Sequence, residues 1–259
     1  MNTEATKSFF KREAVCIVIS TYNNEKTVAD IARQAMDYCD DLIVVNDGCT
    51  DNSVEKLSAL QDKITLVSYP DNQGKGTALT RGFKAATEKG FRYAITMDAD
   101  GQHYASDLPA FAEALTTHPD TLIVGSRQLN QPNMPSKNNF ANRFSNFWFT
   151  VHTGKKLPDT QTGYRLYPLD KMGKMKLLSS RYEAELALLV RSAWRGIDIL
   201  PIPINVYYPP KEERVSHFRP GMDFFRISVL NTFFTFAAIL YGYPAMLFHY
   251  IKSRFQNRI

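Results

Sequence analysis

Two carboxylates spaced two residues apart, Asp98 and Asp100, directly follow a strand-like run at residues 93–96. A carboxylate at the end of a buried strand is costly to desolvate unless it meets a cation. At this spacing the two side chains can converge on one hard metal ion, and Gln102 adds a neutral oxygen ligand two residues further on. The sequence therefore predicts a Mg2+ or Mn2+ site made by Asp98, Asp100 and Gln102.

A divalent ion at these carboxylates suits the phosphates of a nucleotide. It can bridge phosphate oxygens and stabilise the charge that develops on a diphosphate leaving group. We therefore expect Asp100 to be catalytic and Asp98 to belong to the nucleotide site. His103 is a further ligand, a phosphate contact or a packed imidazole, and the sequence leaves these three roles open. Helix capping explains the motif less well, because a cap needs one Asp and not two.

Lys75 is the cation that we expect to reach the nucleotide. The surrounding Gly74-Lys75-Gly76-Thr77 lacks the Gly-x-x-x-x-Gly-Lys spacing of a P-loop, so the lysine would act from a turn that the glycines permit. A solvated surface lysine is the alternative. A nucleotidyltransferase would also use paired carboxylates and a metal, but its glycine-rich, arginine-containing loop near the N-terminus is absent from this sequence.

Short apolar strands alternate with helical patterns through the first half of the chain. The expected strands are residues 15–19, 42–45, 64–67, 93–96 and 122–124, and the expected helices are residues 25–36, 53–60, 76–88 and 107–115. This order is typical of an α/β fold, a Rossmann-like, mostly parallel sheet with helices on both faces. Ligands bind such sheets at the carboxyl ends of the strands, where the polar loops at residues 20–24, 46–48, 98–100 and 126–127 would meet.

The second half is less regular. Residues 138–152 are aromatic and amphipathic, a polar loop from residue 159 enters a short strand that ends near residue 167, and residues 183–194 have helical periodicity. Residues 199–204 read as an extended segment whose prolines favour the edge of the sheet.

Composition limits the classes of function. The 259 residues are 44% hydrophobic and 22% charged, which suits one folded α/β core, and the net charge of +5 favours an anionic partner. Nucleic acid is not the expected partner, because the aromatic residues cluster in the tail and not among basic residues, as base stacking would need. The three cysteines are odd in number and lack a zinc spacing, which favours reduced thiols in a cytosolic compartment.

The C-terminal segment is uncharged between Arg226 and Lys252, and that length permits a membrane span. Gly242 and Pro244 interrupt it, and basic residues flank both ends. A broken hairpin or an in-plane pair of helices would keep both basic clusters on the cytosolic side. Buried helices or a homo-oligomer interface are the alternatives.

Four motifs in order resemble those of family 2 glycosyltransferases with the GT-A fold. They are Ile19-Ser20-Thr21-Tyr22-Asn23-Asn24-Glu25, Val45-Asn46-Asp47-Gly48-Cys49-Thr50-Asp51, Asn72-Gln73-Gly74-Lys75-Gly76 and Asp98-Ala99-Asp100. With Gly125-Ser126-Arg127 and residues 159–167, the chain is similar to the dolichyl- and polyprenyl-phosphate mannose or glucose synthases. We expect an N-terminal lead-in at residues 1–13, a GT-A domain at 14–215 and a basic, apolar membrane-associating segment at 216–259.

The resemblance assigns the donor side of the site. It places Thr21, Tyr22, Glu25 and Asp47 in the nucleoside pocket, with Asp47 accepting from a base N–H. The family usually has Asp-Asp-Gly-Ser where this chain has Asn46-Asp47-Gly48-Cys49, so one charge is missing beside the base. A tight turn is the structural alternative for these residues.

The resemblance also assigns the acceptor side, with Arg127, Arg143 and Asn146 at a lipid phosphate. It implies transfer of a hexose from a GDP- or UDP-linked donor to a polyprenyl phosphate, with inversion, at the cytosolic membrane face. A phosphate nucleophile needs no strong base. Transfer to a hydroxyl of another lipid or an envelope glycan is the alternative, and it needs a carboxylate base.

Asp159 is the leading candidate for that base or for a structural partner, ahead of Glu183 and Glu185. Asp100, Arg127 and Asp159 are thus the expected catalytic residues. Arg165 either steadies the diphosphate or pairs with Asp159. His217 lies in a basic segment that joins the domain to the tail. The cations of this segment either close over the diphosphate or contact anionic lipid headgroups, and the sequence leaves both open.

Overall fold

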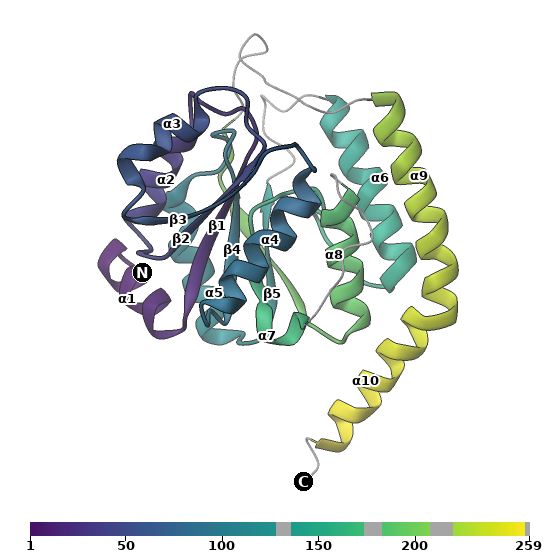
Figure 1. Cartoon of the computed structure of the whole chain (residues 1–259). Coiled ribbons are helices and arrows are strands. Elements are labelled where there is room, and N and C mark those ends of the chain that lie inside the picture. Colours follow the sequence, from purple (N-terminus) through teal and green to yellow (C-terminus); the bar gives the residue numbers. More distant parts are fainter. Residues whose placement is uncertain (128–135, 174–182, 208–219, 257–259) are drawn as a thin grey trace.

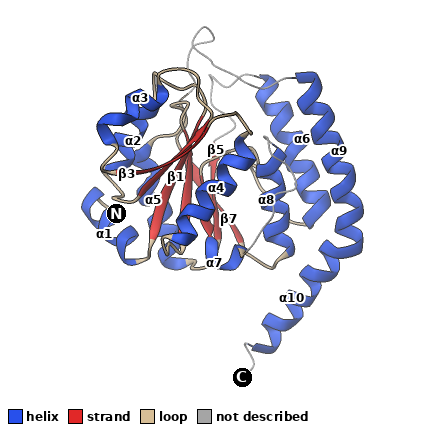
Figure 2. Ribbon diagram, viewed as in Figure 1, coloured by secondary structure: helices blue, strands red, loops and turns tan. Residues whose placement is uncertain are grey.

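The structure is a computed structural model that describes residues 1–127, 136–173, 183–207 and 220–256. Its centre is one seven-stranded sheet of order β3-β2-β1-β4-β6-β5-β7 (Figure 2). The strands are β1 (Val15–Thr21), β2 (Leu42–Asp47), β3 (Ile64–Tyr69), β4 (Tyr93–Asp98), β5 (Leu122–Arg127), β6 (Arg165–Pro168) and β7 (Ile199–Ile204). Within the described chain, β6 alone runs antiparallel to its neighbours β4 and β5. The expected mostly parallel α/β sheet is confirmed.

Helices cover both faces of this sheet (Figure 1). They are α1 (Thr3–Arg12), α2 (Val28–Met36), α3 (Ser53–Leu57), α4 (Lys75–Glu88), α5 (Leu108–Thr117), α6 (Ser136–Thr153), α7 (Leu169–Met172), α8 (Glu183–Trp194), α9 (Pro220–Ala237) and α10 (Tyr243–Gln256), with the short turns η1 (Ser58–Leu60), η2 (Ala105–Asp107) and η4 (Ala238–Gly242). Alternate residues of each strand enter two separate cores, as the pleat of a strand requires. In β1, Ile17 joins the core under α1, α2 and α5, whereas Val18 joins the core under α4, α6 and α8.

Residues 1–13 form part of this packing. Asn2 caps α1 by accepting a 2.8 Å hydrogen bond from the Ala5 N–H, and Phe9 and Phe10 are buried in the same core as β1. The segment expected as a lead-in is therefore a helix on the sheet, and no gap in packing marks residue 14.

The carboxyl ends of β1, β2, β4 and β5 lie at one edge of the sheet, because these strands are parallel. Asp98 is the last residue of β4 and pairs in register with Ser20 of β1. The predicted convergence of the polar loops at one edge is confirmed.

The apolar C-terminal segment follows the side of the domain and does not reverse direction, so the broken hairpin is wrong, whereas the other expected arrangement, helices in the membrane plane, stays a prediction (Figure 1). α9 and α10 are joined by the π-helical turn η4. Pro244, the second residue of α10, follows this turn, and a proline inside a helix removes one backbone hydrogen bond, which is a usual cause of such a local change in a helix. A Cβ on Gly242 would lie 2.4 Å from the Trp194 indole, so this glycine permits close packing. By length and composition, Ile227–Phe255 is a candidate membrane span.

One face of this segment is packed on the domain. Leu230, Phe234 and Ala238, each four residues apart, are buried in the core shared by α6 and α8. The Trp194 Nε1–H donates to the His152 carbonyl at 2.8 Å, and His152 Nε2 lies 3.1 Å from the Asn231 carbonyl oxygen. We call the packing of α9 against α6 and α8 the α9 seam.

Candidate active site

The loops that follow β1 and β2 are held together by hydrogen bonds. Asn23 Oδ1 accepts from the Thr50 N–H at 2.8 Å, and Glu25 Oε2 accepts from the Asn52 N–H at 3.1 Å. The carboxylate of Glu25, predicted to bind the nucleoside, therefore anchors the loop after β2. The structure brings these two predicted pieces of the donor site into contact.

Thr21 and Tyr22 lie at the carboxyl end of β1, beside the end of β2. Thr21 is buried and pairs in register with Asn46. Asn24 Nδ2 lies 3.4 Å from the Thr21 hydroxyl and donates to the Tyr22 carbonyl at 3.1 Å. Both residues thus line the edge where the sheet accepts ligands, and their contact with a nucleoside stays a prediction.

Asp47 is occupied by a second loop. Its carboxylate accepts from the backbone N–H groups of Gln73 and Gly74, at 2.8 and 3.0 Å, and from Asn72 Nδ2 at 3.0 Å. Gly48 has φ +70°, and a Cβ there would lie 2.5 Å from the Asn72 backbone nitrogen, so only glycine permits this approach. Asp47 thereby fixes the turn that starts α4, and its predicted hydrogen bond to a base stays untested.

Lys75, the first residue of α4, binds two carboxylates. Its ammonium forms an ion pair with Asp98 Oδ1 and another with Glu185 Oε1, the latter at 2.9 Å. Gly163 lies directly against this group, because a Cβ there would be 2.5 Å from Asp98 Oδ2 and 2.8 Å from Lys75 Nζ. Lys75 is therefore a buried cation of the site and not a solvated surface lysine.

The surroundings shift the pKa values of the two predicted metal ligands, Asp98 and Asp100, in opposite directions. Burial raises the pKa of Asp98, but the nearby Lys75 ammonium and then His103 outweigh it, so this pKa lies below its usual value. Desolvation, and then the negative charge of Asp98, raise the pKa of Asp100 to about 6. Burial lowers the pKa of His103 to about 4, and its ring packs 5.0 Å from the Tyr164 ring. His103 is therefore a neutral, packed imidazole.

These residues fit a divalent ion that is shared with a substrate. Burial, and then the negative charge of Asp98, disfavour the ionised form of Asp100, and a bound cation would offset both effects. Gln102 lies on the same turn, where its N–H donates to Asp100 Oδ1 at 3.0 Å. Within the described residues, no group of three His, Cys, Asp or Glu side chains could hold a metal. Two carboxylates with phosphate oxygens and water are the usual ligand set of Mg2+ on a nucleotide.

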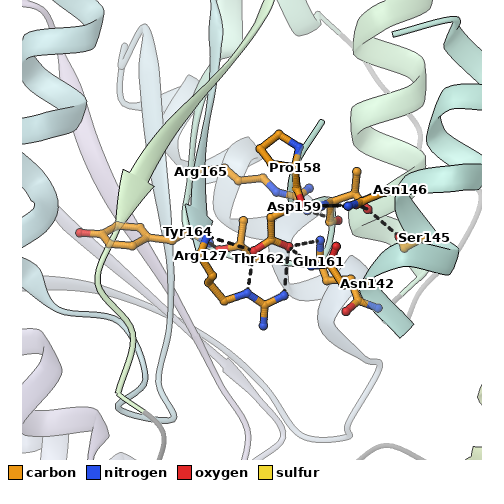
Figure 3. A network of polar contacts seen from close by, with 11 residues as sticks. Arg127, Asn142, Ser145, Asn146, Pro158, Asp159, Gln161, Thr162, Tyr164 and Arg165 are labelled. Atoms are coloured by element: carbon orange, nitrogen blue, oxygen red, sulfur yellow. Dashed lines mark hydrogen bonds and ion pairs between the residues drawn. The ribbon is translucent and has the colours of Figure 1, made fainter. Parts of the chain in front are cut away.

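Asp159 is enclosed in a polar network at the end of β5 (Figure 3). It is 0% exposed and binds Arg127 twice, from Nε to Oδ2 at 2.6 Å and from Nη2 to Oδ1 at 3.0 Å. Asn142 Nδ2 and the Gln161 N–H also donate to Oδ1, at 2.7 and 3.0 Å. Burial raises the pKa of Asp159, but Arg127 outweighs burial and the pKa lies below its usual range. An ionised, fully paired carboxylate is a poor proton acceptor, so these contacts favour the structural role of Asp159, and its role as a base stays a prediction.

Helix α6 supplies the other side of this network. Asn146 Nδ2 donates to the Pro158 carbonyl at 2.8 Å, and Asn146 Oδ1 accepts from the Thr160 N–H at 3.0 Å. The predicted phosphate ligand Asn146 is thus a loop anchor in this structure. Arg143 lies one turn earlier and is exposed to solvent, where an incoming anion can reach it.

Arg165 does not pair with the Asp159 side chain in any described contact. It is fully buried at the start of β6 and donates to the carbonyls of Thr160 and Glu185, at 2.9 and 2.8 Å. It therefore ties the polar loop to the first turn of α8 and has no access to a diphosphate. His217 and the basic segment around it lie outside the described residues.

Two residues of the site were not predicted. Asn142 completes the shell around Asp159, and Gly163 allows the polar loop to reach Asp98. In the sequence, Gly163 was noted only as part of the motif at residues 159–167, without a role of its own. Glu185 was considered only as a base, whereas it is an ion-pair partner of Lys75.

Comparison with known proteins identifies the family of this chain. The model of glycosyl transferase family 2 matches residues 16–172, and the chain belongs to this family of glycosyltransferases. The family predicted from the motifs is confirmed.

Two relatives have names that agree with the polyprenyl-phosphate resemblance. UDP-N-acetylglucosamine–dolichyl-phosphate N-acetylglucosaminyltransferase of Methanococcus voltae is 26% identical in an alignment of length 215 that covers 75% of this chain and 86% of that protein. Undecaprenyl-phosphate mannosyltransferase of Micrococcus luteus is 26% identical in an alignment of length 202 that covers 74% of this chain and 82% of that protein.

A solved structure shares the fold. Glucosyl-3-phosphoglycerate synthase from Mycobacterium tuberculosis, in complex with Mn2+, UDP and phosphoglyceric acid, has a TM-score of 0.64 and 16% identity, and covers 92% of this chain and 81% of that one. The expected GT-A fold is confirmed, and at this identity the likeness shows the fold alone.

Proposed function

We propose that this glycosyltransferase moves a hexose from a GDP- or UDP-linked donor to a polyprenyl phosphate, with inversion, at the cytosolic face of a membrane. One observation carries the proposal: the sheet edge that presents Asp98 and Asp100 at the end of β4 also presents Arg127 at the end of β5. Carboxylates that suit a metal on a diphosphate and a guanidinium that suits a phosphate acceptor thus share one edge.

The donor half of the reaction follows from the ion pairs described above. Mg2+ or Mn2+, held by Asp98, Asp100 and Gln102, would supply positive charge to the departing diphosphate. Lys75 lies beside Asp98 and adds a second cation for the same phosphates. The bond from the anomeric carbon to the diphosphate oxygen breaks while a bond to the acceptor phosphate oxygen forms.

The acceptor half needs no proton acceptor. A phosphate monoester is anionic near neutral pH, so correct orientation supplies much of the rate enhancement. Asp159 is committed to Arg127 and Glu185 is committed to Lys75, which favours a phosphate acceptor over a hydroxyl that would need one of them as a base. Arg127 and the exposed Arg143 are the proposed phosphate ligands, with Asn146 holding the loop between them.

The membrane is the proposed surface for the outer face of α9 and α10. Large apolar side chains on this face are exposed: Val229, Phe233, Phe236, Ile239, Leu240, Tyr241, Tyr243, Leu247, Phe248, Tyr250, Ile251 and Phe255. A contiguous apolar strip of this size marks an interaction surface. Lys252 and Arg254 at its end suit anionic lipid headgroups, and a second copy of the chain is the alternative occupant.

The test is transfer of label to lipid. Protein reconstituted in vesicles is incubated with labelled GDP- or UDP-sugars, Mn2+ and a polyprenyl phosphate, beside an Asp100→Ala control. Metal-dependent label in the organic phase, lost in the control, is the expected result and identifies the donor. Nucleotide binding without a lipid product would contradict the phosphate acceptor and direct the search to hydroxyl acceptors.

A further inference from the structure

The group formed by Lys75, Asp98 and Glu185 joins three elements of the fold. Lys75 begins α4, Asp98 ends β4 and Glu185 lies in the first turn of α8. The three side chains are 16%, 24% and 9% exposed, and the ammonium contacts both carboxylates. Gly163 closes the group from the polar loop. The role of Glu185 in this group is not part of the proposed reaction.

Lys75 controls what Asp98 can bind. A positive charge in contact with a carboxylate repels a second cation, and this repulsion is strong where water is largely excluded. Glu185 keeps the ammonium in place, since a lysine that moved away would leave two buried carboxylates without a partner. A divalent ion arriving alone at Asp98 therefore meets a neutralised ligand.

A nucleoside diphosphate changes this balance. Its phosphates bring negative charge that both the metal ion and the ammonium can contact, and Lys75 can donate to phosphate while Glu185 still holds it. Metal and diphosphate then stabilise each other at the site, and by linkage each raises the affinity of the other by the same factor.

We propose that Lys75, positioned by Glu185, makes divalent-metal binding at Asp98 dependent on the nucleoside diphosphate, so that the two enter together. Glu185 is a positioning residue and Lys75 is the cation through which it acts. This inference rests on the proposed donor site, but not on the acceptor or on transfer.

The experiment measures Mn2+ binding to the full chain in detergent or vesicles, alone and with saturating UDP or GDP. For the wild-type protein, nucleotide should raise Mn2+ affinity at least tenfold. Lys75→Gln should raise the affinity for Mn2+ alone at least tenfold and shrink the effect of nucleotide. Lys84→Gln is the matched control on α4, because Lys84 is 72% exposed and touches only Glu88 among its described ion pairs.

Glu185→Gln separates this role from simple loss of stability. With Glu185 neutralised, the ammonium pairs with Asp98 alone, so the affinity for Mn2+ alone should not rise. The expected result is a gain in affinity for Mn2+ alone in Lys75→Gln and no gain in Glu185→Gln, whereas a general loss of structure would lower Mn2+ binding in both.

Three outcomes overturn the inference. They are wild-type Mn2+ affinity that nucleotide leaves unchanged, folded Lys75→Gln protein with unchanged affinity for Mn2+ alone, and Glu185→Gln protein that gains as much affinity as Lys75→Gln. If Lys75→Gln does not fold, two results still overturn the inference: a wild-type Mn2+ affinity that nucleotide leaves unchanged, and a Glu185→Gln protein that binds Mn2+ alone more tightly than the wild type does. Failure of the wild-type protein to bind either nucleotide would instead refute the proposed donor site.

Discussion

Replacing Gly163 with alanine tests whether the polar loop sets the position of Asp98. The new Cβ would lie 2.5 Å from Asp98 Oδ2, and ordinary contact begins near 3.4 Å. The carboxylate must therefore move by about 0.9 Å, or the loop must move by the same amount. A metal site tolerates changes of only about 0.2 Å in its ligand distances. A misplacement of about 1 Å at a reacting group can cost about 100-fold in rate.

We expect Gly163→Ala to lower metal-dependent sugar transfer about 100-fold with little change in melting temperature. The atoms that must yield are the ends of the Asp98 and Lys75 side chains, so the fold itself is not strained. The assay is the initial rate of label transfer to lipid at saturating donor, with Mn2+ titrated, beside a thermal unfolding curve of the same preparation.

Gly82→Ala is the matched control, because its Cβ would lie 2.5 Å from Val18 Cγ1 in the core under α4. Overpacking there costs roughly 1–3 kcal/mol, so it should lower the melting temperature and leave the rate per folded molecule nearly unchanged. A Gly163→Ala enzyme with a rate within threefold of wild type would refute the reasoning.

Three further outcomes follow from the described contacts. Asp159→Asn should lower the free energy of unfolding by about 3–5 kcal/mol, because it leaves the Arg127 guanidinium without its carboxylate. The depressed pKa of Asp159 adds stability that is present above its unfolded pKa of about 3.9 and is lost as pH falls through the folded value, so the variant should show a weaker acid dependence. Asp100→Asn keeps the oxygen that accepts from the Gln102 N–H, so it should melt within about 2 °C of wild type while transfer falls at least 100-fold. Phe236→Asp with Leu240→Asp should release the protein from vesicles in a sedimentation assay, because these side chains are 64% and 81% exposed.

Each of these has a contrary result. An Asp159→Asn protein as stable as wild type, from denaturant unfolding followed at several pH values, would show that the Arg127 pair contributes little. Full transfer activity of the Asp100→Asn protein would show that the Asp100 carboxylate is not needed as a metal ligand. Unchanged vesicle binding by the folded Phe236→Asp, Leu240→Asp variant would assign the exposed strip to another partner.

The sheet could be predicted because its signal is local. Each predicted strand is a short run of apolar residues, and the polar loops at their ends are adjacent in sequence to the strands that carry them. The orientation of β6 was not predicted, since Leu166 finds its partners Ile95 and Ile123 only when distant segments meet.

The helices at the two ends show the limits of local patterns. Phe9 and Phe10 stand among charged residues in a short segment that was expected only as a lead-in to the domain, and only the core beneath them shows why they form a helix. Gly242 and Pro244 are helix breakers by type, but here Gly242 packs against Trp194 and the helix continues past Pro244 after a π-helical turn.

Residue types in the candidate site could be predicted better than their partners. The motif around Asp98 and the nearby Lys75 were found from sequence, but Glu185 meets Lys75 from 110 positions away. Asp159 was predicted as a base because a free carboxylate can accept a proton. Its partners on β5 and α6 change that chemistry, and no local pattern reports them.

The α9 seam has a consequence for the order in which the chain folds during synthesis. Trp194 and Phe149 precede Phe234 in the chain, so the apolar sides of α6 and α8 emerge from the ribosome before the helix that covers them. At roughly 5–20 residues per second, the interval between Trp194 and Phe234 lasts about 2–8 s. During that time the nascent domain carries an uncovered apolar groove. The helix that covers this groove with Leu230 and Phe234 also carries the first exposed side chains of the strip, Val229, Phe233 and Phe236, so covering the groove brings the start of that strip with it.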